Sequence, residues 1–170
     1  MNLGRVNLRM KKCSKIVKIV SGGQTGADRG GLDAAIELGI PHGGWCPKGR
    51  KAEDGFIPWK YNQQEMDSYT YLRRTEKNVV DSSATVIFCY GPPKGGSRRT
   101  AEFAFKYQKP LLCVDMFQTN EQILALLGDW IDKIQCPQIV LNVAGSRGSN
   151  NPDLQQRVCA IMQMLMQTLA

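Results

Sequence analysis

The chain is poor in the residues that support several common kinds of catalysis and metal binding. It has one histidine, His42, among 170 residues, so no Ser-His-Asp arrangement can be proposed. Its six cysteines are widely separated and none form a Cys-x-x-Cys pair, which together with the single histidine predicts no zinc or other metal site. Cys89 and Cys113 lie inside apolar runs, as buried cysteines in a reducing compartment do.

Long apolar stretches are absent as well. No run is long enough to span a membrane, and the charged N-terminal segment lacks the apolar stretch of a signal peptide. We therefore expect a cytoplasmic protein without membrane contact. The 42% of hydrophobic and 22% of charged residues are ordinary for a globular protein, and 170 residues predict a single domain.

Positive charge is concentrated at the N-terminus. The formal net charge is +7, but residues 1–18 contain six basic side chains and no acid, and the remainder carries 16 basic and 15 acidic side chains. We interpret residues 1–14 as a basic, disordered tail and residues 15–170 as one ligand-binding domain. Because the domain is nearly neutral, contact with nucleic acid is expected only through the tail.

A glycine-rich segment follows a short apolar run. Residues 16–20 have the β-branched character of a buried strand, and residues 21–28 read Ser-Gly-Gly-Gln-Thr-Gly-Ala-Asp. A strand, a glycine turn and a helix start aim backbone N–H groups and a helix dipole at one spot, which suits phosphate or another small anion. The residues predicted to bind it are Gly22, Gly23, Gln24, Thr25, Gly26 and Ala27.

This loop differs from both common phosphate-binding patterns. Gly26 is not followed by Lys-Ser/Thr, so the loop is not a Walker A loop and no ATP hydrolysis is expected. The spacing Gly-Gly-x-x-Gly also differs from the dinucleotide-binding pattern. A glycine-rich connection without a ligand stays open as the simpler interpretation. Asp28 either caps the helix or holds a cation beside the ligand, and we favour capping.

Strand and helix patterns alternate along the chain. Strands are expected at 16–20, 85–90, 111–114 and 139–143, with a short one near 42–47, and helices at 27–38, 71–81, 100–107, 120–134 and 153–169. This alternation predicts an α/β fold of the Rossmann-like, doubly wound kind, a mostly parallel sheet of about five strands with helices on both faces in three layers, α/β/α. Residues 48–69 lack a clear pattern and predict a long functional or mobile segment.

Three loops that combine glycine with serine or threonine follow strands, at residues 21–27, 91–100 and 144–150. In doubly wound folds ligands bind beyond the carboxyl ends of the strands, so these loops predict one site for a polyanionic ligand. The second and third loops contribute Gly95, Gly96, Ser97, Thr100, Gly145, Ser146 and Arg147 to the predicted site. Further basic residues expected to neutralise the ligand are Lys48, Arg50 and Arg74.

Several long motifs resemble the molybdenum cofactor carrier protein family. They are residues 21–35, residues 44–55 (Gly-Trp-Cys-Pro-Lys-Gly-Arg-Lys-Ala-Glu-Asp-Gly), Arg74-Thr75 with Asn78-Val79, Gly95-Gly96-Ser97 with Thr100, and residues 141–145. The resemblance extends over residues 15–168. It implies a Rossmann-like fold related to lysine-decarboxylase-like and LOG-type proteins, with molybdenum cofactor (molybdopterin) as the ligand. It also implies a homo-oligomer, a dimer or tetramer, with molybdoenzymes as possible partners and no catalysis of its own.

Two other functions stay open. LOG-type nucleoside-monophosphate phosphoribohydrolases carry Pro-Gly-Gly-x-Gly-Thr-x-x-Glu, which is similar to residues 93–102, and Glu102 would then be the catalytic acid. The opening loop also resembles DNA-processing protein A, which binds single-stranded nucleic acid. The chain departs from the carrier pattern in two places. One is the run at residues 81–85, and the other is Ser146, where the pattern predicts proline. Both are expected near the ligand edge.

Overall fold

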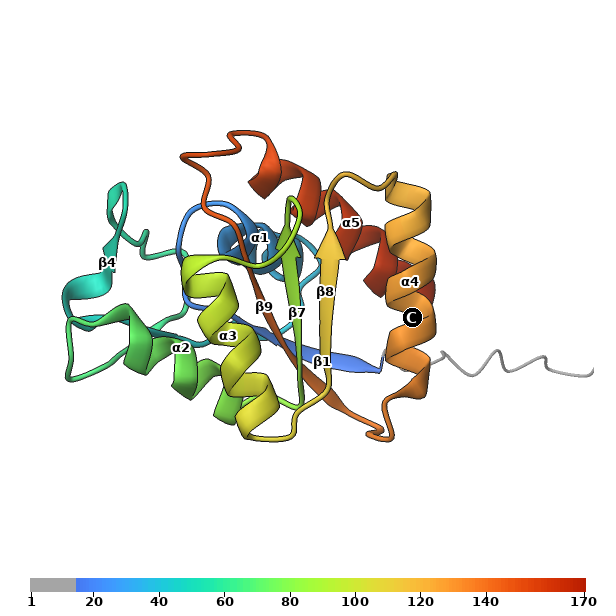
Figure 1. Cartoon of the computed structure of the whole chain (residues 1–170), viewed down its shortest axis with the longest axis horizontal. Helices are drawn as coiled ribbons and strands as arrows, with labels where there is room; N and C mark the ends of the chain where they lie inside the picture. The colour runs from blue at the N-terminus through green and yellow to red at the C-terminus, as the bar shows by residue number, and fades with distance from the viewer. Residues whose placement is uncertain (1–14) are drawn as a thin grey trace, which may run out of the picture.

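Five parallel strands form the central sheet of the computed structural model, in the order β2-β1-β9-β7-β8 (Figure 1). The structure describes residues 15–170, so the predicted basic tail at residues 1–14 lies outside the described residues. The strands of this sheet are β1 (Ile16–Val20), β2 (His42–Gly43), β7 (Ala84–Cys89), β8 (Leu111–Asp115) and β9 (Ile139–Gly145). The predicted mostly parallel sheet of about five strands is confirmed.

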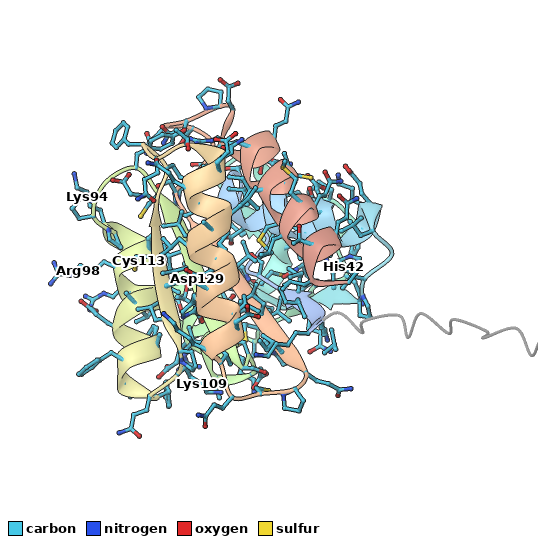
Figure 2. The ribbon with its side chains drawn as sticks, turned by 90° about the vertical axis from the view of Figure 1, so that its right-hand side faces the viewer. His42, Lys94, Arg98, Lys109, Cys113 and Asp129 are labelled. Atoms are coloured by element: carbon cyan, nitrogen blue, oxygen red, sulfur yellow. The ribbon has the colours of Figure 1, made fainter. Side chains whose placement is uncertain are left out.

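Helices cover both faces of this sheet, which gives the predicted three-layer α/β/α arrangement (Figure 1). On one face α1 (Ala27–Glu37) packs against α5 (Leu154–Leu169), and α5 packs against α4 (Asn120–Lys133). On the other face α2 (Tyr71–Val80) packs against α3 (Gly95–Lys106). Figure 2, seen from the side of β8, shows α3 and α4 on opposite sides of that strand.

Apolar side chains fill the space between the sheet and the helices. β7 is buried along its whole length, as expected for a strand of a parallel sheet covered on both faces. The apolar residues of α5 recur at helical spacing and face the sheet; the buried ones are Leu154, Val158, Ile161, Met162, Leu165 and Met166. Within residues 15–170, no helix combines the length and apolar character that crossing a bilayer requires.

The start of α3 differs from the sequence prediction. The helix was expected to begin at Thr100, but it begins at Gly95, and the N–H groups of Ser97 and Arg98 already donate to the carbonyl of Lys94. Glycine has a low helix propensity, so the sequence pattern hides this first turn. The glycines predicted as a loop therefore form the N-terminus of a helix.

The segment predicted to be irregular at residues 48–69 contains regular structure. β3 (Trp45–Cys46) pairs in parallel with β6 (Gln64–Glu65), and β4 (Lys51–Ala52) pairs with β5 (Gly55–Phe56) in a tight hairpin. A short 3-10 helix, η1 (Lys48–Arg50), lies between β3 and β4 in the sequence. These elements form a small lobe beside α2, at the left of Figure 1.

Residues 81–85, which were expected near the ligand, lie at the opposite side of the sheet, where the parallel strands begin. They lead into the amino end of β7, where the N–H of Ser83 donates to the carbonyl of Val140 over 2.7 Å. The hydroxyl of Ser83 in turn accepts from the N–H of Val140 over 3.0 Å. This departure from the carrier pattern therefore changes how β7 begins, far from the carboxyl ends of the strands.

Two adjacent glycines let α1 pack closely on two neighbours. A Cβ atom at Gly30 would lie 2.6 Å from the carbonyl oxygen of Gln155 in α5, and one at Gly31 would lie 2.7 Å from the Cβ atom of Val143 in β9. By contrast, a Cβ atom at Gly128 in α4 would have no neighbour within 4 Å. The same residue type thus serves close packing in α1 and has no such role in α4.

We expect alanine substitutions at these helical glycines to have opposite effects on stability. Gly31→Ala should lower the free energy of unfolding by about 1–3 kcal/mol, because it overpacks the contact with β9. Gly128→Ala should raise it by about 0.5–1 kcal/mol, because alanine loses less backbone entropy on folding. Urea unfolding of the two variants measures the difference, and equal effects would contradict the close approach of α1.

Candidate functional site

The loops after β1, β7 and β9 meet at the carboxyl edge of the sheet, because these strands are parallel neighbours. Ser146, directly after β9, joins the other two loops. Its N–H donates to the carbonyl of Phe88 in β7 over 2.9 Å, and its carbonyl accepts from the N–H of Ala27 over 3.1 Å. Glycine is required at Gly26, since its φ is 84° and a Cβ atom there would lie 2.4 Å from the carbonyl oxygen of Ser146.

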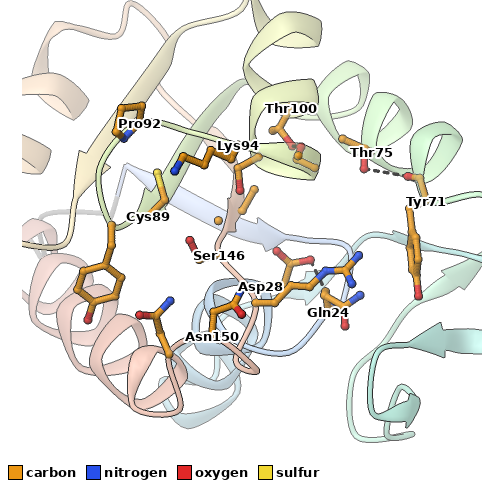
Figure 3. Close-up of a pocket in the computed structure, with 18 of the residues that line it drawn as sticks. Gln24, Asp28, Tyr71, Thr75, Cys89, Pro92, Lys94, Thr100, Ser146 and Asn150 are labelled. Atoms are coloured by element: carbon orange, nitrogen blue, oxygen red, sulfur yellow. Dashed lines mark hydrogen bonds between the residues drawn. The ribbon is translucent and has the colours of Figure 1, made fainter.

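A pocket of about 470 Å³ opens at this edge, with walls from the three loops, the first turn of α3 and one face of α2 (Figure 3). A cavity of this size suits a small-molecule ligand. The predicted site residues that line it are Gln24, Arg74, Gly95, Gly96, Ser97, Thr100, Gly145, Ser146 and Arg147. The lining residues outside that prediction include Asp28, Tyr71, Thr75, Cys89, Tyr90, Lys94 and Asn150.

Positive charge dominates the lining of the pocket. Arg74, Lys94 and Arg147 contribute cations, and Asp28 is the one acid among the lining residues. Asp28 is 4% exposed, and its Oδ2 lies 3.1 Å from Nη1 of Arg74. Burial raises the pKa of Asp28, and the nearby Arg74 opposes this shift. The excess of cations favours an anionic ligand.

Two buried N–H groups at the pocket have no hydrogen-bond acceptor among residues 15–170: Nε2 of Gln24 and Nε of Arg74. The amide oxygen of Gln24 accepts from the N–H groups of Thr25 and Glu53, at 3.1 and 2.9 Å, which fixes the orientation of the amide. An unpaired buried donor costs about 1–3 kcal/mol. An acceptor on a bound ligand would offset that cost.

The first turn of α3 is open to the pocket. A Cβ atom at Gly95 or Gly96 would meet nothing within 4 Å, and no side chain caps this end of the helix. Ser97 and Thr100 are buried beside it, and the Thr100 hydroxyl donates to the carbonyl of Gly96 over 3.0 Å. An open helix N-terminus in a cationic pocket is a favourable place for a phosphate group.

Three N–H groups of the first glycine-rich loop are paired within the protein instead of being free for a ligand. The N–H of Gln24 donates to Asp28, that of Thr25 to Gln24 Oε1, and that of Ala27 to Ser146. The predicted residues of this loop that do not line the pocket are Gly22, Gly23, Thr25, Gly26 and Ala27. The expected phosphate cradle is therefore corrected: this loop holds Gln24 and Asp28 in place.

The glycine at position 22 makes room for a pocket residue. The guanidinium group of Arg74 occupies the position that a Cβ atom at Gly22 would take. The hydroxyl of Thr25 bonds Glu53 and accepts from the N–H of Gly148, so it ties the loop to the lobe and to the segment after β9. The sequence pattern correctly marks this loop as part of the site region, but assigns its glycines the wrong contacts.

Arg50 holds the small lobe together instead of reaching the pocket, which corrects its predicted contact with the ligand. Its side chain is 3% exposed, and the guanidinium group lies 4.5 Å from the ring centre of Trp59. The guanidinium also donates to four backbone carbonyls, those of Ile57, Pro58, Tyr61 and Gln63. Arg50 was expected to neutralise the ligand, and no local sequence pattern indicates its contacts with these carbonyls.

Lys48 and Glu102 also lie outside the pocket. The exposed Lys48 places its Nζ 5.5 Å from the ring centre of Tyr69. Glu102 is exposed on α3, where it pairs with Arg99 and Arg98 at 2.8 and 3.0 Å. The hydrogen bond from Arg99 holds the pKa of Glu102 below its usual range, which does not suit a general acid.

One face of α2 supplies residues that the sequence analysis missed. Tyr71 lies three and four positions before Arg74 and Thr75, so all three side chains share a helix face. The Tyr71 ring centre lies 5.3 Å from the guanidinium carbon of Arg147 and 5.7 Å from that of Arg74. The helical spacing from Arg74 could have identified Tyr71 as a lining residue.

Burial makes two of the cysteine thiols harder to ionise, one of them at the pocket. Cys89 lines the pocket, but burial raises the pKa of its thiol to about 11, and Sγ donates to the carbonyl of Gly91 over 3.3 Å. Burial also raises the pKa of Cys46, which is fully buried. Among the described residues, no three His, Cys, Asp or Glu side chains gather as a metal site would require.

Fold and pocket together define a doubly wound α/β protein with a cationic small-molecule pocket at the carboxyl edge of its sheet. The chain belongs to the circularly permutated YpsA SLOG family, whose sequence profile matches residues 19–166. It is similar to a crystal structure from Syntrophus aciditrophicus SB named "Putative molybdenum carrier protein". The two share 44% identity and a TM-score of 0.85, over 90% of this chain and 96% of that chain.

The comparison with curated proteins gave no match. The family and the similar structure confirm the predicted relationship to molybdenum carrier and LOG-type proteins, and with it the Rossmann-like fold.

We expect the two basic residues of η1 to differ sharply in their effect on stability. Arg50→Ala should lower the free energy of unfolding by about 3 kcal/mol or more, because it leaves several buried carbonyls without donors. Lys48→Ala should change it by less than about 0.5 kcal/mol, because that side chain is exposed. Urea unfolding distinguishes them, and a mild effect of Arg50→Ala would refute its role in the lobe.

Proposed function

We propose that this chain is a carrier that binds the molybdenum cofactor, or a closely related phosphorylated pterin, in the pocket at the carboxyl edge of the sheet. The observation that carries the proposal is the pair of buried, unpaired donors on Gln24 and Arg74 in a pocket with three cations. The name of the similar structure supports molybdenum as part of the cargo. An anionic ligand would pair the free donors and balance the charge.

The residues present fit the chemistry of such a cofactor, which would supply its molybdenum to an acceptor enzyme. Its terminal phosphate would bind the open first turn of α3, where Gly95, Gly96 and the Ser97 hydroxyl meet Lys94. Arg74 and Arg147 would bind a second anionic group. Tyr71 would provide a flat surface against a ring.

The two alternative functions have less support. The hydrolase interpretation depends on Glu102, which lies outside the pocket and is paired with two arginines. The nucleic-acid interpretation depends on the resemblance of the opening loop to DNA-processing protein A, and the nearly neutral charge of the domain argues against it. Contact through the basic tail would involve residues 1–14, outside the described residues. The homo-oligomer, transfer to molybdoenzymes and a cytoplasmic location stay predictions.

Native mass spectrometry of protein purified under anaerobic, reducing conditions tests the proposal directly. A bound mass that matches a pterin cofactor, with molybdenum detected in the same preparation, is the expected result. A bound nucleotide, together with release of free base when nucleotides are added, would overturn the carrier and favour the hydrolase.

We expect an acidic residue at the start of α3 to weaken binding without loss of stability. Gly96→Asp should lower affinity for a pterin monophosphate at least about tenfold through repulsion, whereas the new carboxylate suits the helix dipole and should not weaken the fold. Arg99→Gln makes the same change of charge on an exposed position of the same helix and should bind normally. Isothermal titration calorimetry compares them, and equal affinities would contradict a phosphate at this end.

A further inference from the structure

Two lining residues on the side of the pocket opposite the start of α3, Gln24 and Asp28, carry a hydrogen-bond donor and an acceptor. Figure 3 shows Gln24 and Asp28 on one side and Lys94 and Thr100 on the other. Gln24 and Asp28 are adjacent, since the backbone N–H of Gln24 donates to Oδ2 of Asp28 over 3.2 Å. Both residues are about 95% buried, so any ligand atoms that reach them are removed from water.

The free atom of the Gln24 amide is fixed as a hydrogen-bond donor. The amide oxygen of Gln24 is held by the N–H groups of Thr25 and Glu53, so Nε2 is the atom left for a ligand, and it has no partner among residues 15–170. A flipped amide would break both of these hydrogen bonds. Gln24 therefore offers a fixed donor that calls for an acceptor on the ligand.

The acceptor is the carboxylate of Asp28, which keeps spare capacity. An ionised carboxylate has about four acceptor positions. The backbone of Gln24 and the guanidinium of Arg74 use two of them. Burial raises the pKa of Asp28, and the ion pair with Arg74 opposes this shift by favouring the charged form. At least one position is left for an N–H group of the ligand.

We propose that Gln24 and Asp28 together recognise a lactam edge on the ligand, meaning a ring carbonyl beside a ring N–H. Pterins, guanine and hypoxanthine present this pattern, whereas adenine presents the opposite one, an amino group beside an unprotonated ring nitrogen. This inference rests on the proposed function, because it takes the same pocket as the binding site. It adds a selection for oxo-heterocycles over amino-heterocycles.

The recognition has an energetic reason. A lactam ligand pairs the buried donor of Gln24 and the acceptor of Asp28 at once. An adenine ring would instead bring its amino group against Nε2 and its bare ring nitrogen against the carboxylate. Both pairs would then be mismatched in a buried site, and such mismatches discriminate strongly between ligands.

The test compares two nucleotides that differ at this edge, inosine monophosphate and adenosine monophosphate, by isothermal titration calorimetry. The wild-type chain should bind inosine monophosphate about tenfold or more tightly than adenosine monophosphate. A monophosphate of 6-hydroxymethylpterin forms a third arm. It carries the same edge and should also bind better than adenosine monophosphate, and its rank against inosine monophosphate distinguishes a pterin from a purine ligand.

A single substitution should abolish the preference for inosine monophosphate. Gln24→Glu keeps an oxygen for the N–H groups of Thr25 and Glu53 but replaces the free donor with an acceptor. It should bring the two affinities close together, because inosine monophosphate loses its partner at position 24 while adenosine monophosphate still places a bare ring nitrogen against Asp28. Gln156→Glu adds the same charge at an exposed position on α5 and should keep the wild-type preference. A second variant, Asp28→Asn, should reduce the ratio of the affinity for inosine monophosphate to that for adenosine monophosphate.

The outcomes separate this inference from the proposed function. Equal wild-type affinity for inosine and adenosine monophosphate, with clear binding of both, would overturn the lactam recognition and leave an anion-binding pocket standing. No binding of any of the three monophosphates would overturn both proposals. The comparison of nucleotides on the wild-type chain tests the lactam recognition even if Gln24→Glu fails to fold.

Discussion

The whole site depends on two hydrogen bonds made by the backbone of Ser146. Its N–H and its carbonyl join β7 to the start of α1, with β9 between them. Because these are backbone contacts, they fix the relative positions of three loops whatever side chains those loops carry. The glycine at position 26 allows the contact, and the pocket forms in the space that the three joined loops leave. Serine stands here where the carrier pattern has proline, and it supplies an N–H that proline lacks.

The two glycine-rich segments have different roles in this arrangement. The segment after β1 uses its glycines and three of its N–H groups within the protein, which positions Gln24, Asp28 and Arg74. The segment after β7 leaves its glycines open, at the first turn of α3. A motif rich in glycine therefore has two distinct uses in one pocket, as a support for side chains and as a direct surface for an anion.

The sequence was sufficient for the elements and for the edge of the sheet at which the site lies, because buried parallel strands and amphipathic helices have clear periodicities. It was insufficient where the outcome depended on contacts between distant residues. The four carbonyls around Arg50 come from a lobe whose folding has no local signature, so a buried structural arginine looked like a free cation. The ion pairs of Glu102, the acid of the hydrolase alternative, were also hidden, because pairing with Arg98 and Arg99 on one helix requires α3 to begin at Gly95 rather than at Thr100.

The place of β9 constrains how this protein can be made. β9 comes last among the strands in sequence, yet it separates β1 from β7 in the sheet. Before residues 139–145 are synthesised, the pair β2-β1 and the pair β7-β8 have no shared neighbour, and each leaves one side unpaired. The two half-sheets can join only when β9 enters between them. The pocket, which has walls from the loops after β1, β7 and β9, therefore forms only at that last step.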